Sequence, residues 1–186
     1  YRYDSEEFWF RDGHLLLRGN NGTGKSKVLS LTLPLLLDAH LRSARVEPDG
    51  DPGKKMAWNL LLGGAYERRI GYSWIEFGRL DDAGEPRFVT LGVGLQAVAA
   101  RAGVEAWYFV VDSERRLGRD LWLMSPQRVV HSRERLREAL GSAGQVFDNA
   151  QAYRRAVDEA LAHIDGDDAG GLGQLSHGLG LLEVDA

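Results

Sequence analysis

The sequence predicts a mixed α/β fold, and three observations support this prediction. A glycine-rich segment, 19–26, lies between a short apolar run and a long apolar helical pattern. Three runs rich in β-branched and aromatic residues follow at 71–80, 88–95 and 105–112. Helical patterns follow the glycine-rich segment to about residue 41 and recur at 56–62, at 133–140 and in a segment that ends near residue 164. We therefore expect a mixed sheet with an added antiparallel region and flanking helices.

The glycine-rich segment should be reached through a β-hairpin. Residues 6–11 and 14–18 are strand-like, and Asp12-Gly13 between them is typical of a two-residue hairpin turn. The following helix should run from Lys25 to about residue 41, with a kink at Pro34, which lacks a backbone N–H. Because this helix has almost no polar face, we expect it to be buried against the sheet.

Capping signals predict the shorter helices. A short helix is expected at 56–62. Ser132 is the predicted N-cap of a helix at 133–140, and Asp148 that of a helix ending near Ile164.

Composition indicates a soluble globular protein. The 186 residues carry a net charge of −4, which gives no general attraction to nucleic acid or anionic membranes. The longest apolar run, 28–37, is too short to span a bilayer, and the lack of cysteine agrees with a reducing cytoplasm. We therefore expect a cytoplasmic location. The segment 165–186 holds six glycines and little periodicity, which predicts a poorly specified structure.

The segment 19–26 carries the clearest chemistry, because it matches the phosphate-binding pattern G-x-x-x-x-G-K-[ST]. Its glycines let bare backbone approach an anion, and N–H groups at the start of the helix can converge on phosphates. Lys25 would reach the β- and γ-phosphates, and the Ser26 hydroxyl would be a Mg²⁺ ligand. The predicted nucleotide-binding residues are Gly19, Asn20, Asn21, Gly22, Thr23, Gly24, Lys25, Ser26 and Lys27.

Hydrolysis also needs an acidic residue near Mg²⁺, usually at the end of a buried strand. Asp112 follows four apolar residues and is the best internal candidate. The same stretch is also typical of a hairpin strand that ends in a polar turn, and the hairpin interpretation is favoured.

Three further groups have a functional and a structural interpretation. The aromatic residues 8–10 could stack on a nucleotide base or pack in the core. Arg42 and Arg45, in a predicted loop at 42–55, could touch phosphate or be solvated. Seven arginines against two acidic residues within 115–137 could meet nucleic acid or an acidic partner, or form a solvated helix face. The structural interpretation is favoured in each case.

The phosphate-binding segment and its surroundings resemble the N-terminal head lobe of an SMC/MukB-like P-loop ATPase. Asn21 before the second glycine is the form that SMC and ABC-type heads favour. Residues 10–22, 56–61 and 71–77 are most similar to the SMC-like subunit (JetC) of bacterial Wadjet anti-plasmid systems. The resemblance covers about residues 5–163, so 1–164 would be the head lobe.

The resemblance implies a composite ATP and Mg²⁺ site. In that family the N-terminal lobe supplies Walker A, with Lys25 as the catalytic lysine, and a C-terminal lobe supplies Walker B and the signature motif. The implied partners are that C-terminal lobe, a second head in a homodimer, kleisin-like and other cassette subunits, and DNA. A glutamine of the Q-loop should follow the last helix, but Gln174 lacks the expected flanking residues.

Two other functions remain open. One is a self-contained P-loop NTPase or phosphotransferase that uses Asp112 as its Walker B acid. The other is a non-catalytic interaction module stabilised by nucleotide.

Overall fold

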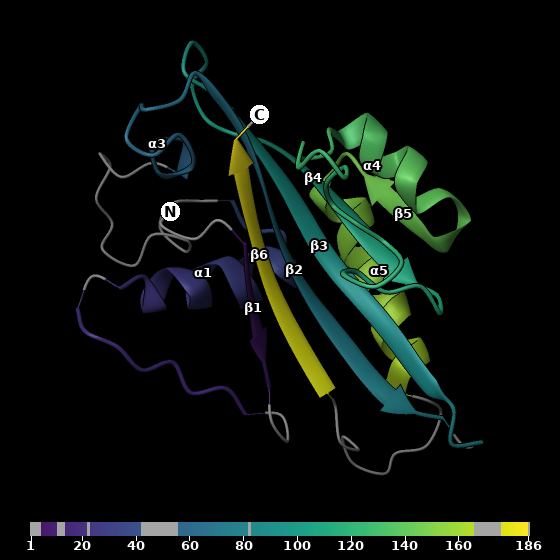
Figure 1. Cartoon of the computed structure of the whole chain (residues 1–186). Coiled ribbons are helices and arrows are strands. Elements are labelled where there is room, and N and C mark those ends of the chain that lie inside the picture. Colours follow the sequence, from purple (N-terminus) through teal and green to yellow (C-terminus); the bar gives the residue numbers. More distant parts are fainter. Residues whose placement is uncertain are drawn as a thin grey trace.

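A computed structural model describes residues 5–10, 14–21, 23–41, 56–81, 83–165 and 176–185. The described strands form one sheet in the order β1-β6-β2-β3-β4-β5 (Figure 1). The strands are β1 (Ser5–Trp9), β2 (Arg68–Leu80), β3 (Pro86–Val98), β4 (Glu105–Asp112), β5 (Gly144–Phe147) and β6 (Ser176–Asp185). The helices are α1 (Lys25–Leu36), α3 (Met56–Leu60), α4 (Arg133–Leu140) and α5 (Ala150–Asp165), with a 3₁₀ turn at Gly141–Ala143.

The mixed α/β class is confirmed, but the sheet is not mixed. Every pairing between neighbouring described strands is antiparallel. The short connections from β2 to β3 and from β3 to β4 explain the central part, because a parallel pair needs a crossover of about a dozen residues or more. Within the described residues, no helix is both long enough and apolar enough to cross a membrane.

The two faces of the sheet are covered by different elements. On one face, which we call the α1 face, the paired residues Ile75, Leu91 and Val110 lie in one core with residues of α1, α3 and α5. On the other, the α4 face, a second core joins the sheet to the segment 117–130 and α4. Figure 1 shows α1 and α5 behind the sheet and α4 in front of it. Burial on both faces explains why β2, β3 and β4 are apolar along their centres.

Two glycines of β3 make room for aromatic rings on the α4 face. Gly92 lies between Trp74 and Phe109 in the strand register, and Gly94 lies between Tyr72 and Trp107. A Cβ atom on Gly92 would lie 2.0 Å from the Phe109 ring, and one on Gly94 would lie 2.2 Å from the Trp107 ring. The rings therefore occupy the volume that side chains at positions 92 and 94 would fill.

A buried tyrosine connects this aromatic cluster to the segment that covers it. The Tyr72 hydroxyl donates to the His131 carbonyl at 2.8 Å and accepts from Trp107 Nε1 at 3.2 Å. Burial raises the pKa of Tyr72 far above its usual range, so the hydroxyl remains a donor. Burial and the nearby Arg135 lower the pKa of His131.

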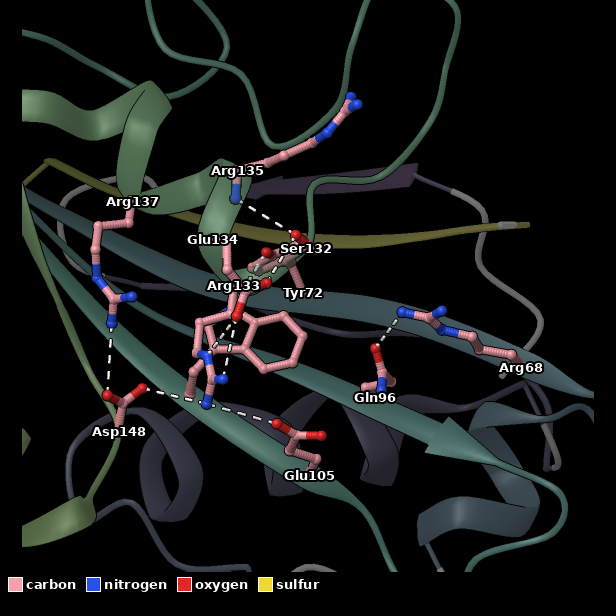
Figure 2. A network of polar contacts seen from close by, with 11 residues as sticks. Arg68, Tyr72, Gln96, Glu105, Ser132, Arg133, Glu134, Arg135, Arg137 and Asp148 are labelled. Atoms are coloured by element: carbon pink, nitrogen blue, oxygen red, sulfur yellow. Dashed lines mark hydrogen bonds and ion pairs between the residues drawn. The ribbon is translucent and has the colours of Figure 1, made fainter.

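The start of α4 is confirmed, and ion pairs tie this helix to the sheet. The Ser132 hydroxyl accepts from the Arg135 N–H at 3.4 Å, as an N-cap does. Figure 2 shows Arg133 between Glu105 on β4 and Asp148 before α5. The Arg133 guanidinium lies 3.5 Å from the Glu105 carboxylate and 3.4 Å from the Asp148 carboxylate. Because these groups are largely exposed, they orient α4 more than they stabilise it.

Two predictions for the last part of the chain are corrected. The N-cap of α5 is Asn149, whose Oδ1 accepts from the Ala152 N–H at 2.8 Å, whereas Asp148 pairs with arginines of α4. Ser176–Asp185 forms β6 between β1 and β2, although its composition predicted no regular structure. Backbone pairing on both sides outweighs the weak β-propensity of its glycines.

We expect Gly92→Ala to destabilise the fold by about 1–3 kcal/mol, because the added methyl group overpacks against the Phe109 ring. Urea denaturation would measure the change. In the double variant Gly92→Ala with Phe109→Leu, leucine is smaller than the phenylalanine ring and leaves room for the added methyl group. The two changes should therefore destabilise by less than the sum of their separate effects. Strict additivity would contradict this packing account.

Candidate phosphate-binding site

The predicted phosphate-binding segment forms a loop that enters α1. Lys25 Nζ donates to the carbonyl oxygens of Gly19 and Asn20, both at 2.7 Å. The Thr23 hydroxyl donates to the Asn20 carbonyl at 2.9 Å and lies 3.4 Å from Lys25 Nζ. The lysine ammonium thus folds back over its own loop and joins the loop's two ends. Gly22 lies outside the described residues.

Glycine is required at two positions of this loop. Gly24 has a φ of 89°, which side-chain-bearing residues rarely adopt, and its carbonyl accepts from the Val28 N–H at 3.1 Å to begin α1. A Cβ atom on Gly19 would lie 2.9 Å from the Thr23 hydroxyl oxygen. The motif glycines are therefore explained by the turn into the helix and by the close approach of Thr23.

The strand expected before the loop does not form. Residues 15–20 have no regular secondary structure, and β1 pairs with β6. The expected turn at Asp12-Gly13 lies outside the described residues. The helix after the loop begins at Lys25 as predicted and ends at Leu36, earlier than expected. The loop and helix are thus present, but the strand–loop–helix context is not complete.

The aromatic residues of β1 divide between the two faces. Phe8 and Phe10 are partly buried and pack against the core of the α1 face. Trp9 is 65% exposed and points to the α4 face, in register with Glu76. Leu17, just before the loop, also packs against the α1-face core, so Trp9 and the loop belong to opposite faces of the sheet. Core packing is therefore the correct interpretation for Phe8 and Phe10.

Asp112 lies at the far side of the sheet from the loop. It ends β4, which is separated from β1 by β6, β2 and β3, and the carboxylate lies 3.5 Å from His163 Nδ1 on α5. Strand spacing places β4 roughly 19 Å from β1. Tyr108 of β4 instead contacts Ala39, beyond the C-terminal end of α1, through a 3.5 Å hydrogen bond. The structure therefore does not bring Asp112 to Lys25.

The described residues near the loop could supply one ligand for Mg²⁺. Among the described residues, no group of three or more His, Asp or Glu side chains could hold a metal ion. Mg²⁺ is commonly bound by one or two protein ligands together with phosphate oxygens and water. The exposed Ser26 hydroxyl at the start of α1 suits a single ligand of that kind.

The arginines of 115–137 are only partly neutralised. Arg116 pairs with Glu76, and Arg133 and Arg137 pair with Asp148. Four others have no carboxylate partner among the described residues: Arg115, Arg119, Arg128 and Arg135. The run is thus part structural and part solvated. Arg42 and Arg45 lie outside the described residues.

A comparison of the chain with protein-family models, with curated proteins and with solved structures found no match.

We expect Gly19→Ala to weaken nucleotide binding by about tenfold, because the new methyl group displaces Thr23 and with it the Lys25 ammonium. Isothermal titration with Mg-ATP would measure the change. Adding Thr23→Ala to this variant removes the clashing hydroxyl and should restore part of the affinity. Unchanged affinity in Gly19→Ala would contradict the geometry of the loop.

Proposed function

We propose that this chain is the ATP-binding half of an SMC-like ATPase head. The observation that carries the proposal is Lys25, whose ammonium bridges the Gly19 and Asn20 carbonyls at the start of a helix. An ammonium held over a glycine-rich loop at a helix N-terminus is an arrangement suited to a phosphate chain. The sequence motif indicates a nucleotide, and its resemblance to SMC-type heads indicates that the nucleotide is ATP.

When a nucleotide binds, the Lys25 ammonium would exchange its carbonyl acceptors for phosphate oxygens. Lys25 now donates to two neutral carbonyl oxygens. A phosphate oxygen carries more negative charge than a carbonyl oxygen, so an incoming nucleotide would compete successfully for the ammonium. Lys25 would then contact the β- and γ-phosphates, N–H groups from Gly22 to Lys27 would surround them, and Ser26 would be a ligand of Mg²⁺.

Among the residues that the structure describes, no carboxylate pairs with Lys25. Asp112, the candidate Walker B acid, lies across the sheet beside His163. A self-contained NTPase that uses Asp112 would need this carboxylate in the Mg²⁺ shell, which the geometry does not support. We therefore propose that a C-terminal lobe supplies the acid and the signature motif, and that ATP then joins two heads.

In the complete assembly this nucleotide cycle would drive DNA handling in the cytoplasm, together with kleisin-like and other cassette subunits. This part of the proposal rests on the resemblance in the sequence.

The direct test of the half-site is steady-state ATPase activity of the chain alone and with a separately expressed C-terminal head lobe. We expect turnover only in the mixture, because only the mixture contains a complete Mg²⁺ shell. Lys25→Ala should abolish the activity. Arg155→Ala removes one exposed positive charge from α5 and should leave it unchanged. Sustained multiple turnover by the chain alone would contradict the half-site.

A further inference from the structure

A second candidate binding site lies on the α4 face, opposite the face of the phosphate-binding loop. It is a cavity of about 180 Å³ between β1 and β2. Its walls are Glu7 and Trp9 from β1 and Trp74 and Glu76 from β2, and the turn 116–119 covers it. The proposed ATPase function uses none of these residues.

In β6, glycines lie in register between the residues of β1 and β2 that line the cavity. Gly178 lies in register between Trp9 and Glu76, and Gly180 lies between Glu7 and Trp74. Figure 1 shows β6 between β1 and β2 along their length. Since a glycine adds no side chain above the sheet, the space between Trp9 of β1 and Trp74 of β2 is left unfilled by β6 at these two positions.

One pair of charges in the cavity is already satisfied. Arg116 Nε lies 3.1 Å from both carboxylate oxygens of Glu76, and its guanidinium lies 3.8 Å from the centre of the Phe88 ring. Both charged side chains are largely buried. A buried, two-point ion pair of this kind holds the covering turn in place over the cavity.

The other pair of charges is not satisfied. Glu7 and Arg119 are exposed, line the same cavity and form no ion pair with each other or with another described residue. A carboxylate and a guanidinium are thus available beside Trp9, whose side chain is 65% exposed. A planar ligand with donors on one edge and acceptors on another would satisfy all three.

We propose that this cavity binds a guanine base. The N1–H and N2–H groups of guanine lie on one edge and suit the Glu7 carboxylate, while O6 and N7 lie on another and suit the Arg119 guanidinium. Trp9 supplies a face on which the base stacks. The cavity volume is below the roughly 300–1,000 Å³ of pockets for drug-sized ligands, and so suits a single bicyclic ring.

Guanine could come from a free nucleotide or from an unpaired base in single-stranded DNA, because both present the same edges. Titration with GMP, IMP and AMP tests the shared chemistry. GMP should bind most tightly; IMP, which lacks the N2 amine, should bind several-fold more weakly, and AMP about tenfold more weakly. Single-stranded 12-mers of thymidine with and without one central dG distinguish the two sources.

Substitutions at Trp9 and Glu7 test which side chain makes each contact with the base. Trp9→Ala should weaken GMP binding by about tenfold through the loss of stacking, with Trp9→Phe retaining most of it. Glu7→Gln should remove the preference for GMP over IMP, since an amide cannot accept both N–H groups as a carboxylate does. Trp122→Ala, which removes another exposed tryptophan outside the cavity, should change nothing.

The Lys25→Ala variant separates this site from the phosphate-binding loop, because GMP binding at the cavity should persist in it. Circular dichroism checks that each variant is folded. Equal affinity for GMP and AMP, an unchanged affinity in both Trp9 variants, or loss of GMP binding in Lys25→Ala would each overturn the proposal. With GMP preferred over AMP, tighter binding of the dG-containing 12-mer than of GMP would identify nucleic acid as the source, and weaker binding would identify the free nucleotide.

Discussion

The glycines at positions 92 and 94 of β3 are the constraint on which the rest of the structure depends. They lie at the centre of the sheet and leave room on the α4 face for the rings of Phe109 and Trp107. With the rings in that place, Tyr72 reaches the His131 carbonyl and fixes the covering segment and α4. The opposite face carries the aliphatic residues Ile75, Leu91 and Val110 at its centre. Beside them, the Ser73 hydroxyl donates to the Leu31 carbonyl of α1, and the Tyr108 ring stacks on Tyr153 of α5.

The two candidate binding sites lie on opposite faces of the sheet. The phosphate-binding loop is anchored through Leu17 and α1 to the α1 face, and Tyr153 of α5 donates to the Leu36 carbonyl at 2.6 Å at the other end of that helix. The helix is therefore fixed at its C-terminal end, and its N-terminal end is left accessible to a ligand. The cavity beside Trp9 lies on the α4 face. A ligand at either site could bind without displacing the other.

Sequence patterns predicted the elements whose signals are local. β4 and α4 have the predicted bounds because periodicity and the Ser132 cap are contained within them. The pairing of distant segments could not be predicted, since β6 is a strand only through its contacts with β1 and β2. The phosphate-binding loop was found from its motif, whereas the cavity depends on a register between β1, β6 and β2 that no local pattern reveals. The function stays a proposal that rests on the motif and the Lys25 geometry.

The most direct test of the central claim is equilibrium binding of Mg-ATP to the chain alone, measured by isothermal titration. The ammonium of Lys25 lies at the loop and is the main cation available to the phosphates in the described part of the site. We therefore predict one saturable site for ATP, weakened at least about tenfold by Lys25→Ala and unaffected by Asp112→Asn. No binding by the wild-type chain, or equal binding by Lys25→Ala, would contradict the account.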